Sequence, residues 1–86
     1  MYTLSASQTF KKQVGKISKQ DPILRKKITR VLKILRKNVK HPSLRLHKLS
    51  GVDTWSVSVT ISTRIIIGIE GKTIYLLEIG KHEEVY

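Results

Sequence analysis

Seven residues in the second half of the chain are our candidates for transferring protons, binding phosphate or stacking on a nucleotide. They are Arg45, His47, Lys48, Arg64, Lys81, His82 and Tyr86. A histidine exchanges its proton near neutral pH, and a guanidinium or ammonium group binds phosphate. A ribonuclease site needs a titratable group, a cation and an aromatic ring, and the ending KHEEVY contains all three. A solvated tail would accept the same residues, so the elements that position them matter.

Several other kinds of site are excluded by composition. The 86 residues include no cysteine, which removes disulfides and thiolate metal sites. The chain has no glycine-rich loop that could cradle phosphate, and no carboxylate pair stands where a general acid and base would be expected. We therefore predict a site without metal or cofactor. The length fits one small domain spanning residues 1–86.

Positive charge is concentrated in the first half of the chain. Seventeen lysines and arginines stand against six acids, for a formal net charge of +11. Residues 1–40 contain twelve of these cations and a single acid, Asp21. Such an imbalance is typical of a surface that binds a polyanion, although a lysine-rich helix face can also serve solubility alone.

Two amphipathic helices are predicted in this basic half. Ser5 or Ser7 can cap the first, whose apolar face carries Phe10, Val14 and Ile17. Asp21 followed by Pro22 predicts the start of the second, which should end near Lys40. Its expected buried residues are Leu24, Ile28, Val31 and Leu35. On its far side lies a row of cations, Lys26, Arg30, Lys33, Lys37 and Lys40, and the first four are named here the cationic ridge.

The pattern changes to strands after Pro42. A short strand is also predicted at the N-terminus, in MYTL. The later strands are expected over residues 44–49, 55–61, 64–69 and 73–80. In the second of these Trp55, Val57, Val59 and Ile61 alternate with polar residues and should be buried, and the third, RIIIGI, is typical of a central strand covered on both faces. The predicted fold class is α+β: an antiparallel sheet of four to five strands with two N-terminal helices packed on one face, in the order βααββββ.

Three segments in this order resemble the RelE/ParE superfamily of toxins from toxin–antitoxin pairs. The segment KLSGVDTWSVSV is similar to the family's LxG and WS segment, TRIIIGI to its strand beginning with arginine, and IGKHEEVY to its C-terminal ending. The resemblance covers the whole chain and is nearest to the RelE, YoeB and YafQ branch. It implies the sheet-and-two-helix fold and cleavage of messenger RNA in the ribosomal A site.

The implied reaction assigns roles to the candidate residues. In this metal-free cleavage the ribose 2′-oxygen attacks the adjacent phosphate, which leaves a 2′,3′-cyclic phosphate and a free 5′-hydroxyl. His82 matches the family's histidine for proton transfer, Arg64 the arginine at the phosphate, and Tyr86 the closing aromatic residue. His47 is the second candidate for proton transfer, and base and acid are not assigned between the two histidines. The expected RNA and phosphate ligands are Lys48, Arg45, Lys81, Lys26, Arg30, Lys33 and Lys37.

Each assignment has a structural alternative. His82 and Tyr86 could be exposed residues of a C-terminal tail, and Arg64 could be a cation at a strand edge. The chain also departs from YafQ-like relatives, which carry a further histidine and an aspartate around the segment VTISTR. That departure leaves the proton transfers to His47 and His82.

Two other functions compete with ribosome-dependent cleavage. A toxin of the ParE type shares the fold but inhibits DNA gyrase. Such a toxin does not need the combination of His82, Arg64 and Tyr86. A general nucleic-acid-binding protein would use the cationic ridge alone, but five aromatic residues give little area for base stacking. The expected partners are an acidic antitoxin, the ribosome with its rRNA, and mRNA. No apolar run approaches the roughly 18 residues that span a bilayer, so we expect a cytoplasmic protein without a membrane partner.

Overall fold

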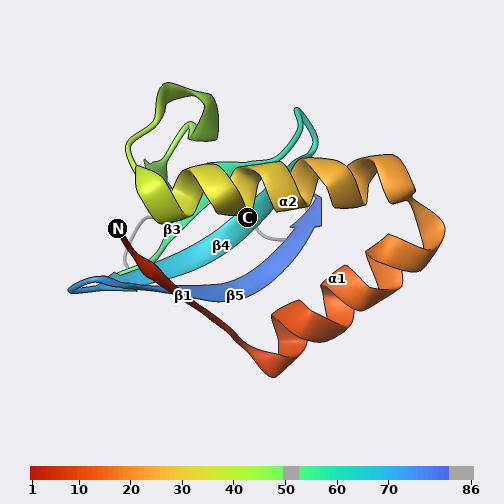
Figure 1. The fold of residues 1–86 in the computed structure, drawn as a ribbon, viewed down its shortest axis with the longest axis horizontal. Coiled ribbons are helices and arrows are strands. Elements are labelled where there is room, and N and C mark those ends of the chain that lie inside the picture. The colour runs from red at the N-terminus through yellow and green to blue at the C-terminus, as the bar shows by residue number, and fades with distance from the viewer. Residues whose placement is uncertain (50–52, 82–86) are drawn as a thin grey trace.

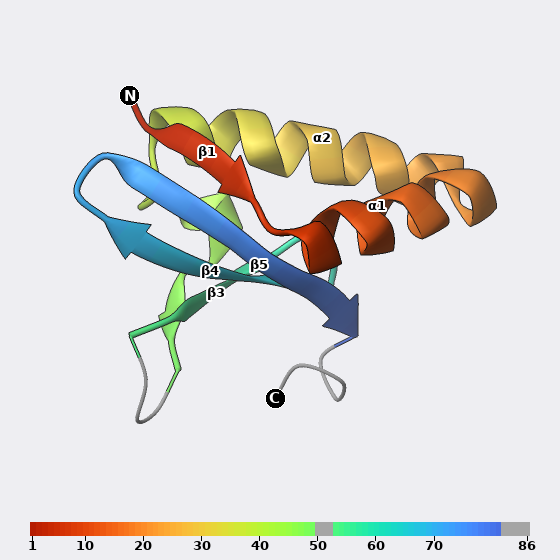
Figure 2. The same cartoon turned by 90° about the horizontal axis from the view of Figure 1, so that it is seen from below.

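The computed structural model describes residues 1–49 and 53–81, which form a sheet covered on one face by two helices (Figure 1). In chain order the elements are β1 (Thr3–Ala6), α1 (Gln8–Gln20), α2 (Pro22–Lys37), the 3-10 helix η1 (Pro42–Leu44), β2 (His47–Lys48), β3 (Trp55–Ser58), β4 (Thr63–Glu70) and β5 (Thr73–Lys81). Figure 2 shows α1 and α2 on the same side of the sheet. The predicted α+β class and order of elements are confirmed.

The five strands lie in the order β1-β5-β4-β3-β2. Strands β2 to β5 pair with antiparallel neighbours, as predicted, but β1 pairs with β5 in parallel. A parallel pair needs a long connection that returns the chain to the starting end of the sheet, and α1 and α2 lie within that connection. The sheet is therefore mixed at one edge.

Both helices begin at the side chains that cap them. Ser7 Oγ accepts a hydrogen bond from the Phe10 amide at 3.0 Å, which decides between the two serines considered for this role. Asp21 Oδ1 accepts from the Leu24 amide at 3.0 Å at the start of α2. Helix α2 ends at Lys37, earlier than expected, because Asn38 leaves helical geometry at φ −155° and ψ 96°.

The hydrophobic core lies between the helices and the sheet. Its buried members are Phe10, Ile28, Val31, Leu35, Val39, Leu44, Val57, Ile65, Ile67, Ile74, Leu76 and Ile79. Strand β4 pairs with β3 and β5 on its two sides, so the prediction of a central strand is confirmed. In the part of the chain that the structure describes, neither helix is long and apolar enough to cross a bilayer.

Two of the predicted strands are shorter than their alternating sequences indicate. Strand β3 ends at Ser58, and Ile61 is fully exposed instead of buried. The cause is a turn in which Thr60 Oγ1 accepts hydrogen bonds from the amides of Ser62 and Thr63. The strand expected over residues 44–49 is reduced to β2, since Leu44 belongs to η1.

We expect Ser7→Ala to lower the free energy of unfolding by about 2 kcal/mol. The Ser7 hydroxyl caps α1 and also donates to the Leu77 carbonyl at 2.7 Å, so alanine leaves two polar backbone groups without this partner. Urea denaturation measures the change. Ser5→Ala, at an exposed position of β1, is the control and should change stability by less than about 0.5 kcal/mol. Equal losses in both variants would contradict the capping role.

Candidate functional site

The candidate site lies on the sheet face that is turned away from both helices, named here the outer face. Side chains alternate along a strand, and Ile65 and Ile67 of β4 belong to the core beneath the helices. Arg64 and Ile66 therefore point to the outer face. The arginine at the start of β4 projects from a rigid central strand.

His47 lies on the same face as Arg64. Its partner across the antiparallel β2–β3 pair is Ser56, and directly opposed residues share a face. Ser56 precedes the buried core residue Val57, which places Ser56 and His47 on the outer face. His47 is exposed, whereas Ser56 is completely buried.

Arg64 is held by two hydrogen bonds to different segments. Its Nε donates to Ser56 Oγ and its Nη2 donates to the Arg45 carbonyl, each at 3.0 Å. Arg45 itself adopts left-handed geometry at φ 48° and ψ 52°. A planar guanidinium bound at two points has its orientation defined by both. The site thus joins β4, β3 and the segment after η1.

The structure separates the other predicted ligands in the second half of the chain. Lys48 is opposite Trp55 in the sheet, with Nζ 5.7 Å from the centre of the indole ring, on the helix side of β2. Lys81 lines a groove beside α1 together with Lys16 and Gln20, also on the helix side. Neither lysine is brought together with His47 and Arg64.

The remaining predicted site residues stand as follows. Arg45 is exposed, and its backbone carbonyl oxygen accepts the hydrogen bond from Arg64. His82 and Tyr86 lie outside the described residues, so their roles stay predictions. The cationic ridge is exposed along α2, as its spacing predicts. Among residues 1–49 and 53–81 there is no group of three or more side chains that could hold a metal ion.

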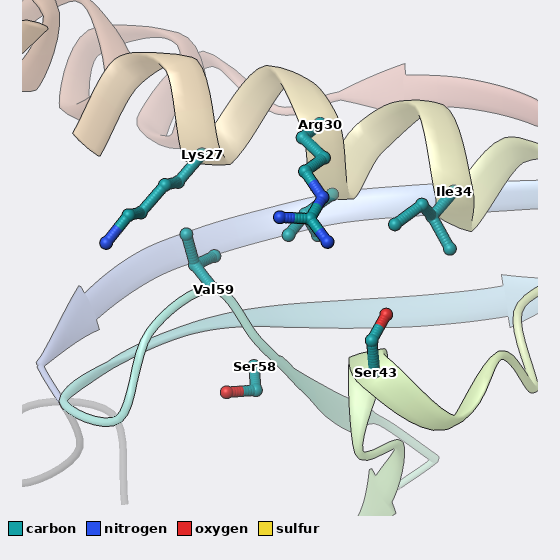
Figure 3. A pocket seen from close by; sticks show the side chains of 7 residues that line it. Lys27, Arg30, Ile34, Ser43, Ser58 and Val59 are labelled. Atoms are coloured by element: carbon teal, nitrogen blue, oxygen red, sulfur yellow. The ribbon is translucent and has the colours of Figure 1, made fainter. Parts of the chain in front are cut away.

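A groove of about 270 Å³ lies between α2, η1 and the end of β3, and we name it the α2–β3 groove. Its lining residues are Lys27, Arg30, Val31, Ile34, Ser43, Ser58 and Val59. Figure 3 shows Lys27, Arg30 and Ile34 projecting from α2 toward the strand. The groove combines two cations with an apolar floor, an arrangement that can take up an acidic segment with apolar side chains.

The sequence analysis did not identify one residue of the α2–β3 groove, Lys27, and one residue of the outer face, Ser56. Lys27 was not assigned to a binding row, although its spacing of three from Arg30 and seven from Ile34 places these residues on one side of α2. The alternating sequence around Ser56 indicates a polar strand position and no particular partner. The contact of Ser56 with Arg64 depends on the pairing of β3 with β4 and β2, which no local pattern specifies.

Solved structures provide the comparison with known proteins. The YoeB/ParE toxin from Agrobacterium tumefaciens matches with a TM-score of 0.83 at 15% identity, over 95% of this chain and 99% of that chain. The Escherichia coli DinJ–YafQ toxin–antitoxin complex matches with a TM-score of 0.81 at 17% identity, over 99% and 97%. The chain has the RelE/ParE toxin fold. A metal-bound toxin from Helicobacter pylori also matches, with a TM-score of 0.81 at 22% identity over all of both chains.

The resemblance inferred from the three motifs is confirmed at the level of the fold. Neither a protein-family model nor a curated protein sequence matches the chain. Because the identities of 15 to 22% are low, the matches establish architecture, and chemistry has to be argued from the site itself.

Proposed function

We propose that the protein is the toxin of a type II toxin–antitoxin pair and that it cleaves messenger RNA in the ribosomal A site. It would act in the cytoplasm as a metal-independent endoribonuclease. The RelE/ParE fold supports the toxin assignment, since the fold neighbours include proteins described as toxins and a toxin–antitoxin complex. The nuclease assignment rests on the outer face.

The observation that carries the proposal is the convergence of Arg64 and His47 around Ser56. Arg64 bonds to Ser56 through Nε, and His47 is the cross-strand partner of the same serine. A guanidinium and an imidazole thus lie on the same face of the sheet, each next to Ser56. This pair can act on a phosphodiester without a bound metal.

The proposed reaction uses the two groups in different ways. A histidine removes the proton from the ribose 2′-hydroxyl, and the 2′-oxygen attacks phosphorus. The bond from phosphorus to the 5′-oxygen breaks, and a protonated histidine supplies the proton to that leaving oxygen. Arg64 stabilises the negative charge that develops on the phosphate oxygens. The products are a 2′,3′-cyclic phosphate and a free 5′-hydroxyl.

His47 and His82 are the two proposed proton-transfer groups, with Tyr86 orienting the substrate nucleotide. A histidine side chain can serve either as the base or as the acid in such a reaction. Two interacting titratable groups can exchange roles, so the base and the acid are left unassigned between the histidines.

Cleavage of message on programmed ribosomes tests the proposal. Purified protein is incubated with ribosomes that carry a defined message, and the breaks are mapped by primer extension. We expect breaks in the A-site codon whose upstream fragments end in a cyclic phosphate. An intact message, together with trapped gyrase–DNA complexes in a parallel reaction, would instead support the ParE-type function.

The cationic surfaces of α2 are proposed to serve two partners. The cationic ridge is exposed to solvent along α2, which suits ribosomal RNA phosphates. The α2–β3 groove pairs Lys27 and Arg30 with Val31, Ile34 and Val59, which suits an acidic antitoxin segment. Arg30 belongs to both surfaces, whereas Lys27 and Lys33 each belong to one.

This division predicts that two single charge reversals weaken binding to different partners. Lys33→Glu should weaken ribosome association and lower its salt dependence by about one unit of log–log slope. Lys27→Glu should instead weaken binding of the cognate antitoxin by roughly tenfold, because a carboxylate then faces an acidic partner. Ribosome co-sedimentation at several salt concentrations and antitoxin titration measure the two effects.

Each variant is the control for the other, since both residues are exposed on α2 and both changes alter the net charge equally. If the two variants weaken both partners to the same extent, only the total charge of the helix matters. The division of α2 into two binding surfaces would then be abandoned.

A further inference from the structure

Ser56 is a fully buried polar residue on the outer face of the sheet. A buried hydroxyl is costly unless it forms hydrogen bonds, so its presence between apolar strand residues needs a reason. The Ser56 Oγ accepts from Arg64 Nε at 3.0 Å. The buried hydroxyl therefore contacts the cation on which the proposed chemistry depends.

The hydrogen bonds of Arg64 to Ser56 and to Arg45 restrain different parts of its guanidinium. Ser56 binds Nε, where the group joins the side-chain stem, and the Arg45 carbonyl binds Nη2 at the far end. Rotation about the last side-chain bonds would break one or both contacts. Since Ser56 lies in β3 between paired neighbours, its hydroxyl is anchored by the sheet.

We propose that Ser56 is a positioning residue that sets the plane of the Arg64 guanidinium for phosphate binding. The inference rests on the proposed nuclease function and assigns Ser56 no contact with substrate. Strand pairing places His47 directly across from Ser56. The buried Ser56 side chain thus holds Arg64 on the same face of the sheet as His47.

The expected effect follows from what Arg64 keeps and loses without the hydroxyl. Its positive charge remains, so attraction of the RNA phosphate is largely retained. The restraint at Nε is lost, and a misplacement of about 1 Å at a reacting centre can cost on the order of 100-fold in rate. We therefore expect Ser56→Ala to lower kcat by about 10- to 100-fold with little change in KM.

The control residue is Ser5, an exposed serine of β1, which lies at the far edge of the sheet from β2 and outside every proposed binding surface. Ser5→Ala should keep kcat within about twofold of wild type, because the Ser56 contact survives. Ser56→Cys provides a second test, since sulfur fills the buried space but is a weak hydrogen-bond acceptor. It should reproduce the loss in kcat even if the alanine variant folds poorly.

A spectroscopic measurement tests the positioning independently of activity. Proton–nitrogen NMR resolves arginine Nε–H signals, and the Arg64 signal is identified by its absence in Arg64→Lys. In wild type this signal should be shifted from the free-arginine position and exchange slowly with water. In Ser56→Ala and Ser56→Cys it should move toward the free-arginine position, but not in Ser5→Ala.

The outcomes separate the positioning role from the proposed function. An Arg64 Nε–H signal that is unchanged in both Ser56 variants would overturn the positioning role, as would equal kcat losses in Ser56→Ala and Ser5→Ala. A wild-type protein that does not cleave message would overturn the nuclease function. In that case the NMR comparison still decides whether Ser56 orients Arg64.

Discussion

Replacing Arg64 by lysine is expected to lower the rate of message cleavage by about 100- to 1000-fold. Lysine keeps the positive charge but lacks the planar group that bonds at once to Ser56 Oγ and the Arg45 carbonyl. A mobile ammonium group cannot match the phosphate oxygens as a fixed guanidinium does. Single-turnover cleavage on programmed ribosomes measures the change.

The control for this substitution is Arg25→Lys, at an exposed position of α2 outside both cationic surfaces. It should retain the wild-type cleavage rate. Thermal unfolding of both variants checks that Arg64→Lys remains folded, because the buried Ser56 hydroxyl loses its contact with Nε. A folded Arg64→Lys variant with the wild-type rate would remove Arg64 from the proposed mechanism.

Leu44→Ala is expected to lower the free energy of unfolding by about 2 to 5 kcal/mol. Leu44 is 0% exposed and joins the core from η1, although it lies in a connecting segment between α2 and β2. Truncation leaves a cavity where the segment is anchored. The same segment carries the Arg45 carbonyl that binds Arg64, so the outer face should also lose order.

Urea denaturation of Leu44→Ala measures this loss, with Ile61→Ala as the matched control. Both wild-type residues are large aliphatic side chains in connecting segments, but Ile61 is 100% exposed. The control should change stability by less than about 0.5 kcal/mol. If the two variants lose similar amounts, the assignment of Leu44 to the core is wrong.

The helices were predictable because their signals are local. A capping side chain, an adjacent proline and an apolar stripe all lie within a few turns, and Asp21 with Pro22 specifies the start of α2 directly. The end of α2 was less predictable. Asn38 competes with the helix through its own side chain, which accepts from the Lys40 amide at 3.0 Å, and this short-range contact stops the helix before Pro42 does.

The strand ends and the site geometry depend on contacts between distant segments. Alternation correctly placed Val57 in the core, but it could not show that the chain turns away before Ile61. Similarly, Arg64 and His47 were identified by residue type and motif, whereas their common neighbour Ser56 emerges only from strand register. The sequence therefore shows the chemical types of Arg64 and His47, but it does not show that Ser56 holds the guanidinium of Arg64 in place.

The parallel pairing of β1 with β5 also has a consequence for folding order. Residues Thr3 to Ala6 take up partners between Thr73 and Leu76, so the first strand finds its place only after nearly the whole chain has been synthesised. Contacts this distant in sequence are slow to form, because a long loop must close before they contribute. We expect a nascent chain to carry an unfinished sheet until its last strand leaves the ribosome. Folding of the complete sheet would then be a late, nearly all-or-none event.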